Sequence, residues 1–240
     1  MWERMGFLFI AVIFLTFLLG MSNVDAEGVS KGDSKASISF IEDTDSNDIL
    51  DPTDPDEPYE PGEGDDGKTD NSGPLSIDYV PKLDFGKQTI SLIDKTYHTK
   101  NVEPFIQVTD KRGEATGWTV TVSATPFESD DDQLEGAKIK FQNATIVTHT
   151  NYVDYGAPIP INNGDIELTT DNVTKPVVYA EEGKGRGSWL TRWFPTDESP
   201  ENLNDSVSLT VIGGTAKDEM YTSTLTWTLE NTPQAPEVEE

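Results

Sequence analysis

Residues 221–229 alternate between threonine and other side chains along the whole segment. One set consists of Tyr221, Ser223, Leu225, Trp227 and Leu229, and the other of Thr222, Thr224, Thr226 and Thr228. Successive side chains of a β-strand point to opposite faces, so this spacing gives one largely apolar face and one threonine ladder. Threonine is also β-branched, which favours extended backbone. The segment can bury its apolar face only as a strand of a sheet, and this constrains the fold to β structure.

Much of the chain repeats this pattern in short segments that turn residues separate. Trp118, Val120 and Val122 again share one side of a strand, and no long stretch has the i, i+3, i+4 apolar spacing of a helix. The expected strands are 75–80, 89–93, 105–109, 118–124, 137–141, 165–168, 177–180, 207–212 and 221–229. Segments 148–172 and 181–206 are expected to be mostly surface loop. The spacing predicts an all-β fold, an antiparallel β-sandwich or jelly-roll-like single domain.

The beginning of the chain has the features of a secretory signal peptide. An apolar run over residues 6–21 follows Arg4, and small residues stand just before Glu27. The run is shorter than the roughly 20 residues that a membrane-spanning helix needs. We expect residues 1–26 to be cleaved, which leaves a secreted chain without membrane contact. The acidic tail 234–240 has neither a sorting motif nor a hydrophobic anchor, so attachment to a surface would be non-covalent.

A segment dense in Asp, Glu and Pro, residues 42–73, interrupts the β pattern. Like charges and regularly spaced prolines favour an extended, self-repelling chain, so this segment is predicted to be a disordered spacer. Before it, Ala36, Ile38 and Phe40 alternate with serines, which predicts a strand within residues 27–41. A lone strand needs a partner. We therefore expect it to join the β domain of residues 74–233, with the acidic spacer as an excursion from one domain.

Composition excludes several classes of function. The 240 residues carry a formal net charge of −27, which argues against a nucleic-acid partner. The chain contains no cysteine, so disulfides and a thiol nucleophile are absent. His98 and His149 have no second ligand at metal-binding spacing, and no serine stands in a Gly-x-Ser-x-Gly motif. We predict no metal, no cofactor and no enzymatic activity.

Two groups of tryptophans are candidate ligand-binding residues. Trp118 and Trp227 share strand faces with aliphatic side chains, so they either fill the core or line a groove that stacks on sugars. Trp189 and Trp193 occur with Arg186 and Arg192 in a predicted loop. That dense aromatic and basic patch either contacts a ligand or closes the end of a sandwich.

Several separated motifs, in order along the chain, resemble those of the WxL-domain family of Gram-positive cell-surface proteins. Trp227-Thr228-Leu229 within residues 213–233 resembles the carboxy-terminal signature of that family. Residues 73–86 resemble its opening segment, residues 107–120 its first tryptophan motif, and residues 185–189 fit its middle. The first motif ends in Val120 where leucine would be expected, a modest apolar change that a strand tolerates.

The resemblance implies a secreted protein at the cell wall that attaches non-covalently to peptidoglycan, alongside other surface proteins encoded with it. Two hypotheses remain open: direct peptidoglycan binding, or a structural module that a partner surface protein retains. The candidate ligand-binding residues are Trp118, Trp227, Leu229, Trp189, Trp193, Arg186 and Arg192.

Overall fold

A computed structural model describes residues 32–62 and 64–234 of the chain. The predicted signal peptide 1–26 and residues 235–240 of the acidic tail lie outside the described residues. The chain divides into two units, Met1–Phe40 and Ile41–Glu240. In the first unit, residues 32–40 contain no strand, and the side chains of Ile38 and Phe40 are 80% and 86% exposed. The strand predicted within residues 27–41 is therefore not formed over the described part of that segment.

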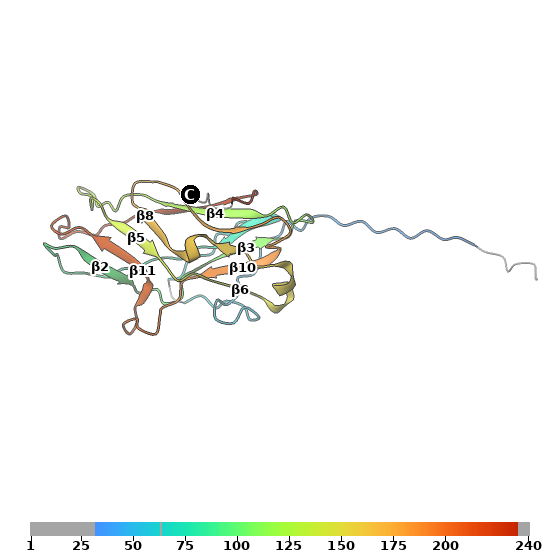
Figure 1. The fold of residues 1–240 in the computed structure, drawn as a ribbon, viewed down its shortest axis with the longest axis horizontal. Helices are drawn as coiled ribbons and strands as arrows, with labels where there is room; N and C mark the ends of the chain where they lie inside the picture. Colours follow the sequence, from blue (N-terminus) through green and yellow to red (C-terminus); the bar gives the residue numbers. More distant parts are fainter. Residues whose placement is uncertain (1–31, 63, 235–240) are drawn as a thin grey trace, which may run out of the picture. The chain divides into compact units, whose positions relative to one another are not determined.

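The second unit is built from three antiparallel four-stranded sheets (Figure 1). The first sheet has the order β1 (Leu75–Tyr79), β3 (Phe105–Asp110), β10 (Gly187–Arg192), β6 (Thr145–Thr148). The second has the order β2 (Lys95–Thr99), β11 (Asn204–Val211), β5 (Lys138–Phe141), β8 (Ile166–Thr169). The third has the order β12 (Leu225–Glu230), β4 (Trp118–Ala124), β9 (Lys175–Ala180), β7 (Ile159–Pro160). Two short 3-10 helices are η1 (Thr150–Tyr155) and η2 (Ile161–Gly164). The all-β prediction is confirmed, and the arrangement is consistent with a β-sandwich.

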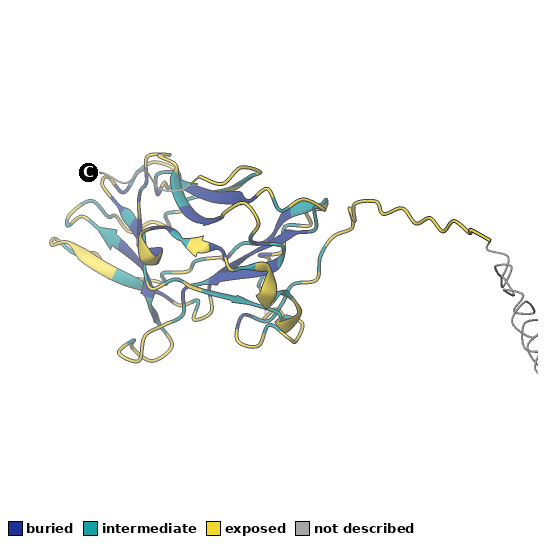
Figure 2. Cartoon of the chain, turned by 45° about the vertical axis from the view of Figure 1, so that its right-hand side comes forward, coloured by how far each residue is buried: buried dark blue, intermediate teal, exposed yellow. Residues whose placement is uncertain are grey.

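All three sheets contribute to one hydrophobic core. Figure 2 shows the buried residues of the chain, polar ones included, in dark blue. Alternate residues of central strands point into the core, as strand geometry requires. The almost fully buried members include Ile106 and Val108 of β3, Val120 and Val122 of β4, and Ile139 and Phe141 of β5. The alternation of apolar residues in 118–123 therefore identified the face of β4 that joins the hydrophobic core, although Thr119 and Thr121 on the other face are buried too.

Some strand assignments from the sequence were wrong. Residues 89–93 form no strand, and the side chains of Ile90, Leu92 and Ile93 are 50%, 86% and 66% exposed. The nearest strand is β2, which begins two residues later and pairs with β11. Its sequence, Lys-Thr-Tyr-His-Thr, is polar, so the apolar pattern did not predict it. The predicted loop 181–206 contains β10, whose interior residues are all buried. A strand covered on both faces shows no apolar and polar alternation, so period 2 did not reveal it.

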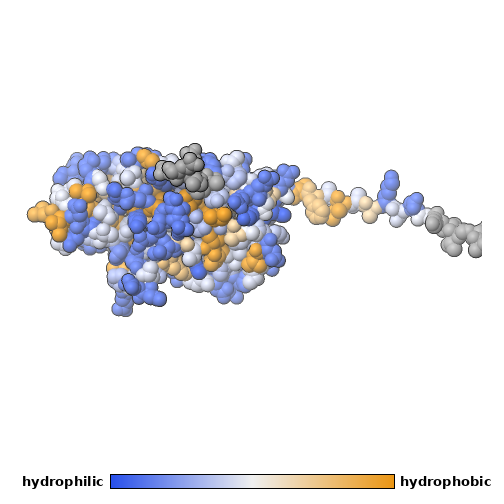
Figure 3. All heavy atoms as spheres, viewed as in Figure 1, coloured by the Kyte–Doolittle hydropathy of each residue, from blue (hydrophilic) through white to orange (hydrophobic). Residues whose placement is uncertain are grey.

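Exposed apolar side chains gather at one end of the second unit. Figure 3 shows orange surface at the left-hand end, where β2 begins and β11 ends in Figure 1. The exposed large apolar residues of this region include Ile90, Leu92, Ile93, Ile212 and Met220. Apolar side chains gathered in one exposed region typically mark an interaction surface.

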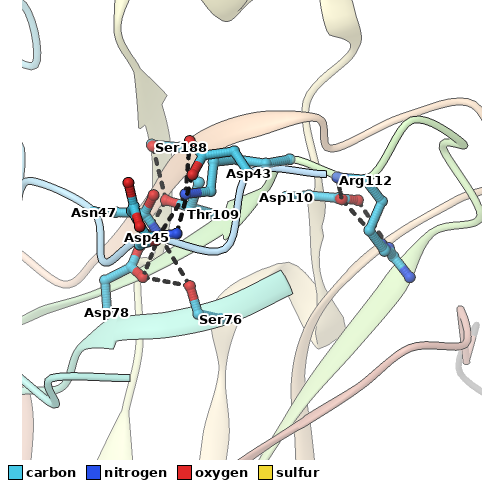
Figure 4. A network of polar contacts seen from close by, with 10 residues as sticks. Asp43, Asp45, Asn47, Ser76, Asp78, Thr109, Asp110, Arg112 and Ser188 are labelled. Atoms are coloured by element: carbon cyan, nitrogen blue, oxygen red, sulfur yellow. Dashed lines mark hydrogen bonds and ion pairs between the residues drawn. The ribbon is translucent and has the colours of Figure 1, made fainter. Parts of the chain in front are cut away.

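The face of the first sheet opposite the main core is covered by residues 47–59 of the acidic segment. The buried carboxylate of Asp78 in β1 joins the two parts (Figure 4). It accepts hydrogen bonds from Asn47 Nδ2 at 2.9 Å, Gln107 Nε2 at 3.0 Å and Thr109 Oγ1 at 2.6 Å. Ser76 Oγ adds a fourth bond at 2.6 Å. Buried carboxylates are costly unless hydrogen-bonded, and this one is fully surrounded by donors.

An aromatic cluster holds the same segment further along. Tyr79 and Phe105 stack with ring centroids 4.1 Å apart, and Tyr59 meets both rings edge-on. Both tyrosine hydroxyls donate to the carboxylate of Asp65. Burial and the hydrogen bond to Asp65 raise the pKa of Tyr59 to about 12. Burial and hydrogen bonds with Tyr59 and Asp65 also raise the pKa of Tyr79.

The packed conformation of residues 47–59 differs from the disordered spacer that composition predicted. Three of its apolar side chains, Ile49, Leu50 and Tyr59, pack on the second cluster of buried residues. The carboxylate of Asp51 forms local hydrogen bonds, because it accepts the backbone N–H groups of Thr53 and Asp54. The amino-acid composition of this segment gives the number of its charges, but it does not show which hydrogen-bond donors lie next to them in the fold.

Replacing Asp78 tests how strongly the acidic segment is held. Asp78→Ala removes the shared acceptor of four hydrogen bonds at a buried position, so the free energy of unfolding should fall by about 3–5 kcal/mol. Urea unfolding followed by tryptophan fluorescence measures the change. Asp66→Ala is the control, because that carboxylate is 75% exposed in its ion pair with Lys82, and a change within about 0.5 kcal/mol is expected. Equal losses for the two variants would contradict the assigned role of Asp78.

The pKa of Tyr59 predicts a loss of stability in alkali. A phenol that ionises near 12 when folded and at 10.0 when unfolded binds its proton more tightly in the folded state. Its contribution is fully present below pH 10 and is lost as pH rises toward 12. Urea unfolding at pH 9 and pH 11 should show a smaller alkaline loss for Tyr59→Phe than for the parent. The same alkaline loss of stability in both proteins would contradict the raised pKa of Tyr59 in the folded state.

Candidate functional site

Three of the predicted ligand-binding tryptophans are buried in the structure. Trp118, Trp189 and Trp193 are 1%, 5% and 0% exposed. The indole N–H of Trp118 donates to the carbonyl of Gly185 at 3.1 Å, and that of Trp189 donates to the carbonyl of Arg186 at 2.8 Å. For Trp118, Trp189 and Trp193, the structure favours the interpretation as core residues over direct ligand contact.

The carboxy-terminal motif is only half-buried. Trp227 packs inward, with its ring centroid 6.0 Å from those of Trp193 and Phe141. Leu229, two residues further along β12, packs against the same core. Both side chains therefore contribute to the core, while the threonines between them, Thr226 and Thr228, are exposed.

The patch predicted around residues 185–193 is divided by the strand that runs through it. Arg186 lies just before β10 and Arg192 at its other end. Arg192 donates to Thr145 Oγ1 and to the carbonyl of Pro52, so it holds the acidic segment. Burial lowers the pKa of its guanidinium. Arg192 is occupied by these contacts, whereas Arg186 lies beside a different set of aromatic residues.

His149, Tyr152, Tyr155 and Arg186 form a half-exposed group that we call the tyrosine platform. The rings of Tyr152 and Tyr155 stack with centroids 6.4 Å apart, and the His149 ring lies 5.8 Å from that of Tyr152. The guanidinium of Arg186 lies over the Tyr155 ring, 5.1 Å from its centroid. Tyr155 is 42% exposed. The platform therefore presents an aromatic face and a cation to the surroundings.

Local sequence explains how η1 carries the two tyrosines. His149 caps this helix, because its Nδ1 accepts the backbone N–H of Asn151 at 3.0 Å. An accepting Nδ1 carries no proton, so its 3.5 Å approach to Asp56 is not an ion pair in this geometry. Asp56 instead accepts the backbone N–H of Thr150 at 2.8 Å, and this bond lowers its pKa. The acidic segment thus fixes the beginning of η1.

Two glycines place Arg186 against the platform. A Cβ on Gly185 would lie 2.7 Å from the indole nitrogen of Trp118, and one on Gly187 would lie 2.4 Å from the Tyr152 ring. Both have positive φ, at +76° and +84°, which suits glycine. The two glycines let the chain approach Trp118 and Tyr152 closely on either side of Arg186.

The platform can bind a ligand that combines apolar C–H faces with anionic groups. Aromatic faces carry partial negative charge and attract polarised C–H groups, and a guanidinium pairs with carboxylates. Of the predicted site residues, only Arg186 belongs to this group. The sequence reasoning missed Tyr152 and Tyr155, although the run His-Thr-Asn-Tyr-Val-Asp-Tyr over residues 149–155 stood out as aromatic within a polar stretch.

The parts of the chain that the structure describes show two further features. They contain no group of three or more His, Cys, Asp or Glu placed to hold a metal ion. They also contain no helix with the length and apolar character needed to cross a membrane.

The three antiparallel sheets place the protein in the class of all-β domains. The family model of the WxL domain, described as a surface cell wall-binding domain, matches residues 27–233. The chain therefore belongs to the WxL domain family, and the protein is located at the cell surface, in the cell wall. A search of the curated proteins and a search of the solved structures each found no match.

Substitution of Gly187 tests how the platform is built. Gly187→Ala introduces both backbone strain at positive φ and a clash with Tyr152, so unfolding free energy should fall by about 2–4 kcal/mol. Gly183→Ala is a matched control, because Gly183 has the same φ of +84° and nothing within 4 Å of an added Cβ. It should lose only about 1–2 kcal/mol from backbone strain. Thermal and urea unfolding compare the two, and identical losses would show that Tyr152 does not pack on Gly187.

Proposed function

We propose that this protein attaches non-covalently to the cell wall by binding peptidoglycan at the tyrosine platform. The observation that carries the proposal is the exposed ring of Tyr155 with the Arg186 guanidinium lying over it. Family membership supplies the cell wall as the target. The platform is the aromatic and basic group that remains accessible after the predicted tryptophans are buried.

The chemistry of peptidoglycan suits these side chains. Its sugar rings offer C–H faces to Tyr152 and Tyr155, and its stem peptides offer carboxylates to Arg186. The formal net charge of −27 opposes approach to an anionic wall, so binding depends on short-range contacts. Higher salt screens that repulsion and should assist approach. We propose a secreted, purely binding role without a catalytic step.

Co-sedimentation tests this function directly. The purified protein of residues 27–240 is mixed with washed peptidoglycan, stripped of teichoic acids and proteins, at two salt concentrations. The parent should pellet with the wall. Tyr155→Ala and Arg186→Ala should each weaken binding about tenfold, since each removes a contact of roughly 1 kcal/mol or more.

Conservative variants separate ligand contact from folding. Tyr155→Phe keeps the ring and should retain most of the binding, whereas Arg186→Lys keeps charge but not the forked donors and should bind at an intermediate level. If both alanine variants pellet like the parent, the platform is not the binding site. If the parent itself stays in solution, retention by a partner surface protein becomes the better account.

A further inference from the structure

An apolar groove of about 950 Å³ opens between the second and third sheets, at the end of the unit where exposed apolar residues gather. Leu209 and Val211 of β11 line it, as do Leu225 and Trp227 of β12. The segment before β2 also contributes, with Ile90 and Ile93 among the lining residues. Figure 3 shows apolar surface in this region.

Two sheet edges border this groove. β2 is the outermost strand of the second sheet and β12 the outermost strand of the third, and residues of both line the groove. Within the described part of the chain, no strand pairs with the free side of either one. An edge strand presents unpaired N–H and C=O groups and can accept a further strand. The groove is therefore suited to an extended peptide with apolar residues at alternate positions.

The chain itself contains such a peptide. Residues 36–41 read Ala-Ser-Ile-Ser-Phe-Ile, with apolar side chains at every second position up to Phe40. They belong to no strand, and Ile38, Phe40 and Ile41 are 80%, 86% and 95% exposed. Leaving three large apolar side chains in water is unfavourable, and burial in an apolar groove would offset that cost.

The chain connection argues that this peptide fills the groove of another molecule. Asp43 pairs with Lys111 at 3.1 Å, and Asn47 donates to Ser76, which fixes residues 43–47 on the first sheet. Only a few residues separate Phe40 from this anchor, and each spans at most about 3.5 Å. Within the second unit, β2 and β11 lie at the opposite end from this anchor (Figure 1).

We propose that residues 36–41 of one molecule insert as an added β-strand into the groove of a second copy. Lys87 and Lys95, which form no ion pair among the described residues, line the groove together with Asp218 and Glu219, and either lysine can pair with Glu42 directly after the inserted strand. The contact is head-to-tail, because the peptide and the groove are different surfaces. Repetition of such a contact forms a closed ring or an open filament. This inference is independent of peptidoglycan binding.

Analytical ultracentrifugation of residues 27–240 tests the association. The parent should form oligomers whose size grows with concentration up to about 0.1 mM. Ile38→Asp with Phe40→Asp should be monomeric, and its fold should be unchanged because both side chains are exposed. Ser37→Asp with Ser39→Asp carries the same added charge on the opposite face and should still associate. A monomeric parent, or equal association of both double variants, would overturn the proposal.

A peptide measurement locates the acceptor. A fluorescent peptide of residues 34–44 is titrated into the monomeric Ile38→Asp, Phe40→Asp protein, and a rise in anisotropy reports binding. Adding Ile93→Asp with Met220→Asp at the exposed rim of the groove should weaken binding at least tenfold. Binding that is insensitive to these two changes would place the acceptor elsewhere. Absence of peptide binding would leave the groove to a strand from a different protein and would also overturn the proposal.

Discussion

The buried carboxylate of Asp78 is the interaction on which the arrangement of this domain depends most directly. It sits on the face of the first sheet that does not contact the main core, where a charge without partners would be too costly. Donors from β1, β3 and the acidic segment meet it together. Gln107 has a double role, because its side chain also bonds the backbone of Asp48 and Leu50. The sheet and its covering segment therefore stabilise each other.

This arrangement gives structural reasons for the motifs of the WxL family as they occur in this chain. In residues 107–120, Gln107 and Thr109 bind Asp78, Arg112 forms a two-pronged ion pair with Asp110, and Trp118 fills the core. The same arginine also bonds the carbonyl of Gly117 and so closes the turn before β4. These residues hold the fold, and Trp118 also bonds the carbonyl of Gly185, next to Arg186 of the candidate site.

Residue types alone predicted only part of the candidate site. Tryptophan can stack on sugars, but its size suits it equally to a core. Trp118, Trp189 and Trp193 are buried, which favours the core role for these three. The sequence grouped Arg186 with Trp189, Trp193 and Arg192, whereas in the structure it lies over Tyr155 of η1. The pairing of β10 with β6 brings these distant residues together, and no local pattern encodes that pairing.

The sequence by itself determined the β class, the family and the inward faces of strands such as β4, because side-chain alternation is a local property with period 2. Local patterns did not reveal β10, which is covered on both faces, or β2, which is polar. Composition also predicted a disordered spacer where residues 47–59 pack on the first sheet. Only the tertiary structure decided these features, because burial of a charge or a strand depends on partners that lie far away along the chain.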